Sequence, residues 1–488
     1  MPPMTFELPK SIEKWSIHLI GIKGTGQCAL AELLVAAGAS VTGSDVDERF
    51  YTDDVLEQLG ITPLPFASDS LPQDCRLAIR SAAYDNDNPV VAEVLQRGIP
   101  LLDYPQALGQ LSQRYGACAI SGVHGKTTTT ALCGSLVREL GLPATVVVGS
   151  AVAAFGDRST WREGDDFLIA ETCEYRRHFL HFHPQRIILT SVESDHQDYY
   201  PDYASIRDAF VEFVLTLPDG GELIYCADDV GACEVAEHAA AERSDLVLTP
   251  YGVKAPGLWA LKYLAPQSGE NRFQVKAYEN TVFSLSVPGE QIALDAVAAL
   301  ALCKSLLSEC PPVDQVAQAL LSFQGSRRRS ERLGEGHGVV VMDDYGHHPT
   351  AIQLTLDGLR KFFPDRRIVV DFMPHTYSRT EALFEEFSCA FSNADVLLLH
   401  PIYASAREEY TGTVSGEQLY RATAEQRGDL PTYFCENFDV AYEKLLSELK
   451  PHDVLLTLGA GNNRGLGIRV LEFLQDQEKK NLVEDSNQ

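Results

Sequence analysis

Basic residues are scarce in this sequence compared with acidic ones. The chain of 488 residues contains 40 lysines and arginines against 68 aspartates and glutamates, a formal net charge of −28. A surface for nucleic acid or for an anionic membrane needs a basic patch that faces phosphates. The charge balance therefore argues against a nucleic-acid or membrane partner, although small phosphorylated substrates need only local basic groups.

Paired cysteines and long apolar runs are also missing. The eleven cysteines are an odd number and include no CxxC motif, which is typical of reduced thiols in the cytoplasm. No apolar run approaches the ~20 residues that span a bilayer. The opening MPPMTFELPKSIEKWS has no apolar core of the kind found in signal peptides. These absences predict a cytoplasmic location.

The strand and helix pattern divides the chain into three segments, as its length suggests at roughly 150 residues for a domain. Residues 1–108 and 326–488 alternate short apolar strands with helices, which predicts a Rossmann-like parallel sheet in each. Residues 109–325 contain a glycine-bounded loop and further strands. We therefore expect an α/β protein of three domains. The clearest early strands are expected at 17–22, 40–43, 79–84, 167–171 and 186–192.

The most informative stretch is AISGVHGKTTTT, which runs from Ala119 to Thr130. A short apolar strand enters a loop with Gly122 and Gly125, and a helix follows. Backbone N–H groups, a helix N-terminus, the ammonium of Lys126 and the hydroxyl of Thr127 then converge. Such groups suit nucleotide phosphates and Mg²⁺.

This loop departs from the usual phosphate-loop spacing, which has four residues between the glycines. Here there are two, Val123 and His124. A plain glycine-bounded helix start would explain neither the Lys-Thr pair nor the adjacent histidine, so we favour a nucleotide site of a variant kind.

An earlier glycine cluster, GIKGTG, follows the first strand and contains Gly21, Gly24 and Gly26. Its spacing is not that of dinucleotide enzymes, so a dehydrogenase is disfavoured. A pyrophosphate at the helix N-terminus and a tight turn with a helix cap remain open alternatives. Asp45, which ends the second strand, is a candidate acceptor for a ribose hydroxyl.

Acidic residues and a histidine end two strands of the middle segment. Glu171 ends FLIAE, and TSVESDH brings Glu193, Asp195 and His196. The carboxyl ends of parallel strands face the ligand crevice. Glu171 and His196, together with Thr127, are therefore candidate Mg²⁺ ligands. Glu174 and Asp198 are weaker candidates for the same role.

The third segment opens with the basic run RRRSER, Arg327 to Arg332. It is either a solvated turn or the source of an arginine that stabilises a transferring phosphoryl group. Two further clusters, DDYGHHP and MPHTYSRT, follow apolar strands. Arg379 can pair with a small carboxylate, and His347 or His375 can orient an amine or take its proton.

Taken in order, these motifs resemble those of the Mur ligases of peptidoglycan synthesis, and DDYGHHPT with PHTYSRT resembles the alanine-adding branch. The resemblance covers nearly the whole chain. It implies a UDP-sugar domain, a central P-loop ATPase domain and an amino-acid domain. The implied reaction uses ATP and Mg²⁺ to activate the lactyl carboxylate of UDP-N-acetylmuramate as an acyl phosphate, which L-alanine attacks. The implied process is cell wall biogenesis, and so cell shape and division.

The resemblance also implies roles for individual residues. Contacts to ATP are implied for Gly122, Val123, His124, Gly125, Lys126, Thr127, Thr128, Asp295, Arg329 and Asp344. Contacts to the other substrates are implied for Gly21, Gly24, Thr25, Gly26, Ser44, Asp45, Ser81, Tyr345, His347, His375, Tyr377 and Arg379. Catalytic roles are implied for Lys126, His196, Arg329, His347, His375 and Arg379. The metal ligands are expected to be Thr127, Glu171 and His196.

The sequence departs from the family pattern at several positions. Ser191 replaces an asparagine that is usual there, Thr376 replaces an arginine, and Gln291, Ile292 and Asp295 alter a nucleotide-binding segment. Two alternatives therefore stay open beside the alanine-adding ligase. One is a related ligase that reattaches a recycled peptide to UDP-N-acetylmuramate. The other is a non-catalytic nucleotide-binding protein on the same scaffold. We expect a monomer or homodimer.

Overall fold

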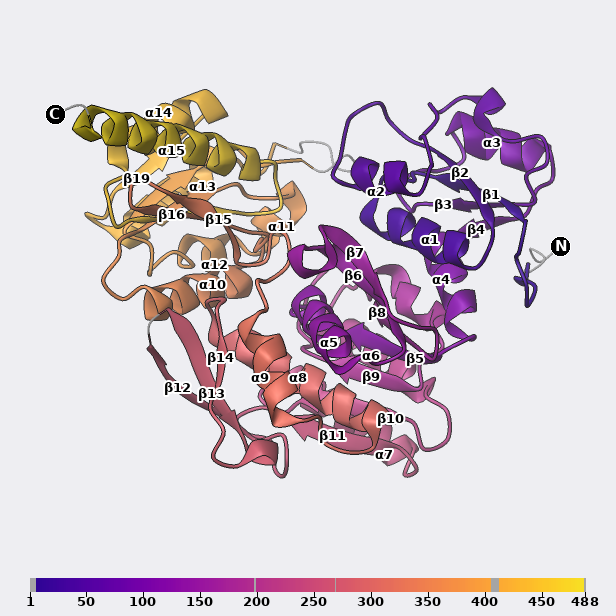
Figure 1. Cartoon of the computed structure of the whole chain (residues 1–488). Helices are drawn as coiled ribbons and strands as arrows, with labels where there is room; N and C mark the ends of the chain where they lie inside the picture. The colour runs from indigo at the N-terminus through magenta and orange to yellow at the C-terminus, as the bar shows by residue number, and fades with distance from the viewer. Residues whose placement is uncertain (1–5, 197–198, 268, 405–411, 487–488) are drawn as a thin grey trace. The chain divides into compact units, whose positions relative to one another are not determined.

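The computed structural model describes residues 6–196, 199–267, 269–404 and 412–486, with side chains through residue 480. They form two compact units, each with its own sheets (Figure 1). The first unit contains residues 1–261, 275–278 and 295–319. The second contains residues 262–274, 279–294 and 320–488.

The first unit opens with a four-stranded parallel sheet in the order β2-β1-β3-β4. Its strands are β1 (Ser16–Ile20), β2 (Ser40–Ser44), β3 (Leu77–Arg80) and β4 (Leu101–Asp103). The helices that alternate with them are α1 (Thr25–Ala36), α2 (Thr52–Gln58), α3 (Pro89–Gln96) and α4 (Tyr104–Ser112). Strand β1 is buried along its whole length, because a parallel sheet covered on both faces excludes water from both sides.

A seven-stranded sheet completes the first unit, in the order β11-β10-β9-β5-β8-β6-β7. Its strands are β5 (Gly116–Ser121), β6 (Ala144–Val152), β7 (Arg158–Arg162), β8 (Phe167–Glu171), β9 (Arg186–Leu189), β10 (Glu222–Cys226) and β11 (Val247–Tyr251). Its helices include α5 (Lys126–Leu140), α6 (Tyr203–Leu215) and α7 (Val230–Glu242). Strand β5 lies between β8 and β9 and is parallel to both, so the chain leaves these three strands at one edge of the sheet.

The second unit is built on a six-stranded sheet in the order β15-β16-β20-β17-β18-β19. Its strands are β15 (Glu331–Gly336), β16 (Val339–Asp344), β17 (Ile368–Phe372), β18 (Val396–Leu399), β19 (Thr432–Phe434) and β20 (Val454–Leu458). Its helices are α10 (Pro349–Phe362), α11 (Tyr377–Ala382), α12 (Phe384–Ser388), α13 (Gly416–Arg427), α14 (Phe438–Glu448) and α15 (Arg464–Ser486). Only β15 is antiparallel to its neighbour among the pairings described for this sheet.

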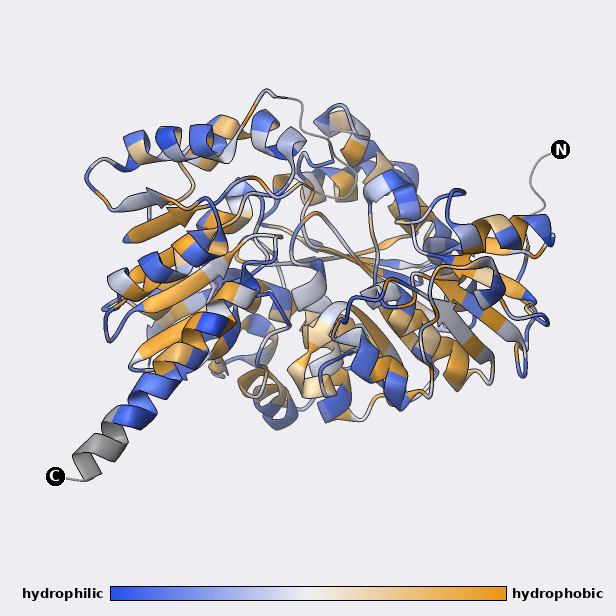
Figure 2. Cartoon of the chain, turned by 90° about the horizontal axis from the view of Figure 1, so that it is seen from above, coloured by the Kyte–Doolittle hydropathy of each residue, from blue (hydrophilic) through white to orange (hydrophobic). Residues whose placement is uncertain are grey.

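Alternate residues of these strands fill two cores, one on each face of the sheet. Val370 and Phe372 belong to one core, whereas Val369 belongs to the other. This alternation follows from the two-residue period of a strand. Figure 2 shows the result as hydrophobic strands among helices that mix hydrophobic and hydrophilic residues.

A small three-stranded sheet also clusters with the second unit. It has the order β12-β13-β14, with strands β12 (Leu261–Gln267), β13 (Glu270–Val275) and β14 (Phe283–Leu285). The helices α8 (Glu290–Leu307) and α9 (Val313–Leu321) follow, and the chain passes between the units within each of them.

The expected α/β class with Rossmann-like sheets is confirmed. Strand β8 has the predicted bounds, whereas β3 and β9 end earlier than predicted, at Arg80 and Leu189. The apolar residues Ala82, Ala83 and Tyr84 continue past Arg80, and Val192 lies beyond the polar Thr190 and Ser191. Apolar residues therefore do not mark where the chain leaves the sheet.

Candidate active site

The loop between β5 and α5 approaches the end of β9 too closely for side chains at its glycines. Gly122 has φ +133°, and a Cβ there would lie 2.1 Å from Thr190 Oγ1. Gly125 has φ +81°, and a Cβ there would lie 2.9 Å from Asp295 Oδ1. These are positions that only glycine occupies without strain. The residues around the loop therefore require glycine at both positions, and Asp295 is one of these surrounding residues.

Ser191 anchors the same loop. Its carbonyl oxygen accepts a hydrogen bond from Val123 N at 3.0 Å, and its Oγ accepts one from His124 N at 2.9 Å. The serine that departs from the usual asparagine therefore retains an oxygen acceptor at this position. His124 Nε2 contacts a carboxylate oxygen of Glu193.

Helix α5 begins directly at this loop. Gly125 is its N-cap, and no side chain in the described parts of the chain caps it. The first-turn N–H groups, with Thr127 and Thr128 among them, form the positive end of the helix dipole. A phosphate suits such an end, so the observed geometry fits the predicted nucleotide loop.

Lys126 and His196 meet at the buried carboxylate of Glu174. Lys126 Nζ lies 3.0 Å from Glu174 Oε2 and also donates to the backbone oxygens of Gly122 and Val123. Glu174 Oε1 lies 3.3 Å from His196 Nε2. The side chain of Glu174 is only 3% exposed, and its backbone oxygen accepts from Tyr200.

Charge in this cluster overcomes the effect of burial. Burial disfavours the ammonium of Lys126, yet the negative charge of Glu174 and its neighbours outweighs it and raises the pKa of Lys126. Burial likewise opposes ionisation of Glu174, but the Lys126 ammonium and His196 lower the pKa of Glu174. Both groups are therefore ionised near neutral pH. The carboxylate that sequence reasoning treated as a weaker candidate is the one that joins the predicted lysine and histidine.

Glu171 lies beside this cluster and accepts a hydrogen bond from the hydroxyl of Thr127. Its Oε2 accepts hydrogen bonds from Thr127 Oγ1 and Gly149 N, both at 2.9 Å. A Cβ at Gly149 would lie 2.4 Å from the same oxygen. The remaining acidic candidate of this stretch, Asp195, accepts from His196 N at 2.8 Å, and Asp198 lies outside the described residues.

Two glycines of the first glycine cluster lie close against aromatic rings. A Cβ at Gly21, where φ is +84°, would lie 2.5 Å from the Tyr84 ring, and a Cβ at Gly26 would lie 2.9 Å from the Tyr104 ring. Helix α1 starts after Gly24, and no side-chain cap is found for it among the described residues. This geometry is compatible with a pyrophosphate at the helix N-terminus and also with a tight turn that only starts the helix.

The polar candidates of the first sheet make hydrogen bonds within the protein. Asp45 accepts from Lys23 N and Val46 N, both at 2.7 Å, and from Tyr84 Oη at 3.2 Å. Its carboxylate therefore orders this turn in the protein itself. The other hydroxyl candidates pair as Thr25 with Tyr51, Ser44 with His18, and Ser81 with Ala83 N.

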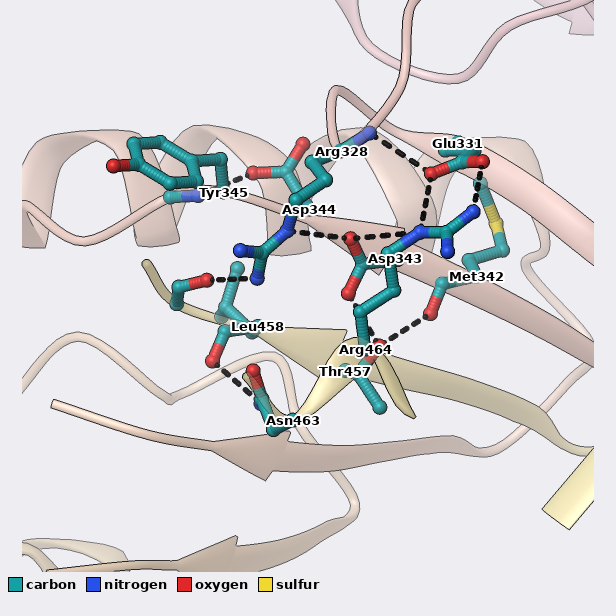
Figure 3. Close-up of polar contacts among 12 residues, drawn as sticks. Arg328, Glu331, Met342, Asp343, Asp344, Tyr345, Thr457, Leu458, Asn463 and Arg464 are labelled. Carbon is teal, nitrogen blue, oxygen red and sulfur yellow. Dashed lines mark hydrogen bonds and ion pairs between the residues drawn. The ribbon is translucent and has the colours of Figure 1, made fainter. Parts of the chain in front are cut away.

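In the second unit, two arginines face a buried aspartate from different elements (Figure 3). Arg328 Nε lies 3.1 Å from Asp343 Oδ2, and Arg464 Nε lies 4.0 Å from the same oxygen. Thr457 Oγ1 donates to Asp343 Oδ1 at 2.6 Å. Burial raises the pKa of Asp343 to about 6, against the opposing effect of Arg328. Because Arg328 Nη2 also donates to the Gly459 oxygen, the basic run is anchored to the sheet and is not simply a solvated turn.

Arg329 lies near Asp344 and Tyr345, the two residues that follow Asp343. Asp344 accepts from Ser330 N and Gly346 N, both at 2.7 Å. Burial raises the pKa of Asp344, and Arg329 opposes that rise. The Arg329 guanidinium lies 5.0 Å from the centre of the Tyr345 ring, within the range of a cation–π contact.

The two predicted histidine clusters meet at the ends of β16 and β17. The ring centres of His347 and His375 are 6.1 Å apart. His347 Nδ1 lies 3.0 Å from the Tyr345 oxygen, so Nδ1 donates and a neutral ring carries its lone pair on Nε2. Tyr377 and Arg379 follow in α11. The candidate base and the candidate carboxylate anchor thus come from the same edge of one sheet.

Sequence reasoning missed one buried polar network, formed by Asp371, His400 and Asn463. His400 Nε2 lies 2.7 Å from Asp371 Oδ1, and Asn463 Nδ2 donates to Asp371 Oδ2 at 3.1 Å. Burial opposes a charge on His400, but the Asp371 carboxylate outweighs it and raises the pKa of His400. The available signal was an aspartate inside the apolar run RIVVDF and a histidine that ends DVLLLH.

Comparison with known proteins gives one consistent result. Family models described as the Mur ligase catalytic, middle and glutamate ligase domains match residues 16–116, 120–303 and 328–461. The UDP-N-acetylmuramate–L-alanine ligase of Treponema pallidum is 49% identical over 96% of this chain and 99% of its own.

Two solved structures share the fold. The UDP-N-acetylmuramate-alanine ligase of Thermotoga maritima has a TM-score of 0.76 and 24% identity, covering 95% of this chain and 99% of its own. The murein peptide ligase of Psychrobacter arcticus has a TM-score of 0.66 and 22% identity, covering 94% and 99%. Within the part of the chain that the structure describes, no helix has the length and apolar character needed to cross a membrane.

Proposed function

This chain belongs to the Mur ligase family, and we propose that it is an ATP-dependent ligase that joins L-alanine to UDP-N-acetylmuramate. The amide would form at the lactyl carboxylate through an acyl phosphate, in the synthesis of peptidoglycan precursors. The observation that carries this proposal is the Lys126–Glu174–His196 cluster beside the start of α5. The name of the Treponema pallidum relative supports the choice of substrates.

In this proposal the loop Gly122–Thr128 holds the ATP phosphates. The N–H groups at the start of α5 and the Lys126 ammonium neutralise phosphate charge without reorganising, because Glu174 already fixes the ammonium. We assign Asp295, Arg329 and Asp344 to nucleotide binding together with the loop.

Magnesium fits the donors at this site. Thr127 Oγ1, the carboxylates of Glu171 and Glu174, and His196 Nε2 are oxygen and imidazole donors gathered by the contacts described above. Bound Mg²⁺ would supply positive charge to the β- and γ-phosphates. We infer that Glu174 joins the three ligands expected from sequence.

The chemistry divides into two steps. A carboxylate oxygen of UDP-N-acetylmuramate attacks the γ-phosphorus and ADP leaves. The amine of L-alanine then attacks the carbonyl carbon, and phosphate leaves with the oxygen that it gained. His347 Nε2, or alternatively His375, takes the amine proton, and Arg379 pairs with the alanine carboxylate. Arg329 stabilises the transferred phosphoryl group.

The remaining substrate contacts are assigned to the first sheet and to the third segment. We propose that the UDP-sugar lies at Gly21, Gly24, Thr25, Gly26, Ser44, Asp45 and Ser81, and that Tyr345 and Tyr377 line the amino-acid site. Three domains at residues 1–108, 109–325 and 326–488 would carry these functions. We also propose a cytoplasmic monomer or homodimer that acts on small molecules and binds neither nucleic acid nor membrane.

Phosphate release tests this proposal. Reactions that contain ATP and Mg²⁺ are compared with and without UDP-N-acetylmuramate and L-alanine. The ligase requires both for turnover, so ATP hydrolysis alone would refute it. Replacing L-alanine by glycine, L-serine or a free tripeptide then separates the alanine-adding ligase from a ligase that reattaches a recycled peptide. Turnover with the tripeptide but not with L-alanine would favour the recycling ligase.

A further inference from the structure

An ionic network is buried in an apolar face of the second unit. Asp371 and His400 have no exposed surface, and neither does Asn463. Asp371 follows Val369 on the same face of β17, and the His400 ring packs edge-on against Phe438 at 5.3 Å. The core on this face consists of Val, Leu and Ala side chains with Cys435, and Phe438 packs against it.

Burial of this kind is not explained by stability. Removing two charges from water costs several kcal/mol for each ion, and apolar residues of similar volume are often as stable or more stable. The network instead fixes geometry, because its hydrogen bonds have few alternative arrangements. Asn463 Nδ2 lies 3.0 Å from the Asp371 backbone oxygen, 3.1 Å from Asp371 Oδ2 and 3.1 Å from the Leu458 backbone oxygen. These contacts tie the ends of β17 and β20 together, and His400 ties β17 to the end of β18.

The segment that leaves β17, residues 373–376, starts at a backbone oxygen that Asn463 of the network also contacts. Met373 N donates to the Leu458 oxygen at 3.0 Å. Cβ atoms at Gly459 and Gly461 would lie 2.3 Å from the Met373 oxygen and 2.2 Å from its sulfur. The chain after β20 therefore fits closely against the start of the segment.

The other side of the segment pairs with the chain after His400. Tyr403 N donates to the Pro374 oxygen at 2.8 Å, and Thr376 N donates to the Tyr403 oxygen at 3.1 Å. The rings of His375 and Tyr403 stack with centres 5.9 Å apart. Thr376 has φ +68°, a costly conformation for a β-branched residue that persists only where the surroundings enforce it.

We propose that the Asp371–His400–Asn463 network is a positioning device for the amino-acid site. By holding three strand ends in register, it sets the path of residues 373–376 and so the placement of His375 and Arg379. This inference rests on the proposed function, since it assigns L-alanine to that site. The three residues do not touch the substrate; they act through the segment.

The test replaces the ion pair by apolar side chains in the variant Asp371→Leu/His400→Leu and measures KM for each substrate, kcat and Tm. Displacing a substrate anchor by about 1 Å costs up to about 100-fold in rate. We expect KM for L-alanine to rise at least about tenfold, while KM for ATP and for UDP-N-acetylmuramate stays within about twofold and Tm is not lowered. The single variant Asp371→Asn keeps a partner for both Asn463 and a neutral His400, so its KM for L-alanine should stay near the wild-type value.

The matched control is Val370→Ala on the same strand, which removes core volume without touching the network. It should lower Tm and leave KM for L-alanine unchanged. The proposal is overturned if the double leucine variant has a wild-type KM for L-alanine, or if its three KM values rise together. If that variant does not fold, Asn463→Ala takes its place with the same expected selectivity for L-alanine.

Amide hydrogen exchange separates this inference from the proposed function. If the wild-type protein has no turnover with L-alanine, the proposed function fails, yet the network can still be tested. Exchange at Met373 N and Thr376 N should be faster in the double leucine variant than in wild type and unchanged in Val370→Ala. Equal exchange in all three proteins would overturn the positioning role.

Discussion

Glu174 Oε2 lies 3.0 Å from Lys126 Nζ, and the other oxygen of the same carboxylate lies 3.3 Å from His196 Nε2. One buried carboxylate therefore joins the lysine of the nucleotide loop to the histidine that follows β9. This relationship fixes the ammonium before any phosphate arrives, which is how a preorganised charge lowers the barrier to phosphoryl transfer. It also places a potential metal ligand within reach of the phosphate site.

Replacing Lys126 by alanine should abolish turnover. We expect kcat to fall by about 10³-fold or more, because the charge that stabilises the transferring phosphoryl group is lost. The protein should stay folded, since Glu174 can take up a proton when its partner is removed. Steady-state phosphate release and circular dichroism measure the two effects. The exposed Lys479→Ala is the control, and wild-type activity in Lys126→Ala would refute the role of the loop.

Glu174 and Glu171 should differ in their effect on magnesium. Glu174→Gln removes a carboxylate that contacts both Lys126 and His196, so the Mg²⁺ concentration for half-maximal activity should rise about tenfold or more. Glu171→Gln should raise it less, because its Oε2 serves Thr127 and Gly149 through hydrogen bonds that an amide oxygen also accepts. Activity titrated against Mg²⁺ compares the two variants. A larger effect for Glu171→Gln would show that Glu171 contributes more than Glu174 to magnesium binding.

Two glycines with φ above zero offer a matched pair at the ends of α5. A Cβ at Gly125 would lie 2.9 Å from Asp295 Oδ1, whereas a Cβ at Gly141 has open space within 4 Å. Both Gly→Ala changes should cost about 1–2 kcal/mol of stability through the backbone. Only Gly125→Ala should also raise KM for ATP, because it shifts the loop. The same KM for ATP in both variants would contradict the structural role of the loop.

Asp343 should make stability depend on pH. Its pKa is about 6 in the fold against the ordinary value of 3.8, so the native state holds this proton more tightly than the unfolded state. Its contribution to the free energy of unfolding is present at low pH and is lost as pH rises through about 4 to 6. The loss is on the order of 3 kcal/mol.

Urea unfolding at several pH values measures this contribution. Asp343→Asn cannot ionise, so its free energy of unfolding should fall less than that of wild type between about pH 4 and about pH 7. Parallel curves for the two proteins would show that Asp343 does not titrate in this range.

The sequence allowed the fold class to be predicted because its parallel strands are buried on both faces. Their near-continuous apolar runs are bounded by glycines and polar residues, as in FLIAE and VVVMDDY. The small sheet β12–β14 was harder to place, since contacts distant in sequence decide which unit it joins. Strand ends were also misplaced where apolar residues continue beyond the ladder, as after Arg80.

Within the candidate site, residues that form a local motif were predictable, but their partners were not. The spacing of Gly122, Gly125 and Lys126 indicated a phosphate loop by itself. The roles of Glu174 and Ser191 depend on strands β8 and β9 meeting the loop, which the sequence alone does not encode locally. Asp371 and His400 were not predicted, because their pairing requires β17 and β18 to be neighbours in register.

Isotope transfer from the sugar substrate tests the acyl phosphate most directly. UDP-N-acetylmuramate with both lactyl carboxylate oxygens labelled as ¹⁸O is turned over with ATP, Mg²⁺ and L-alanine, and the released phosphate is analysed by mass spectrometry. The account predicts a single ¹⁸O in the phosphate for each amide formed, because the attacking carboxylate oxygen leaves with phosphorus. Unlabelled phosphate, released in step with the amide, would contradict it.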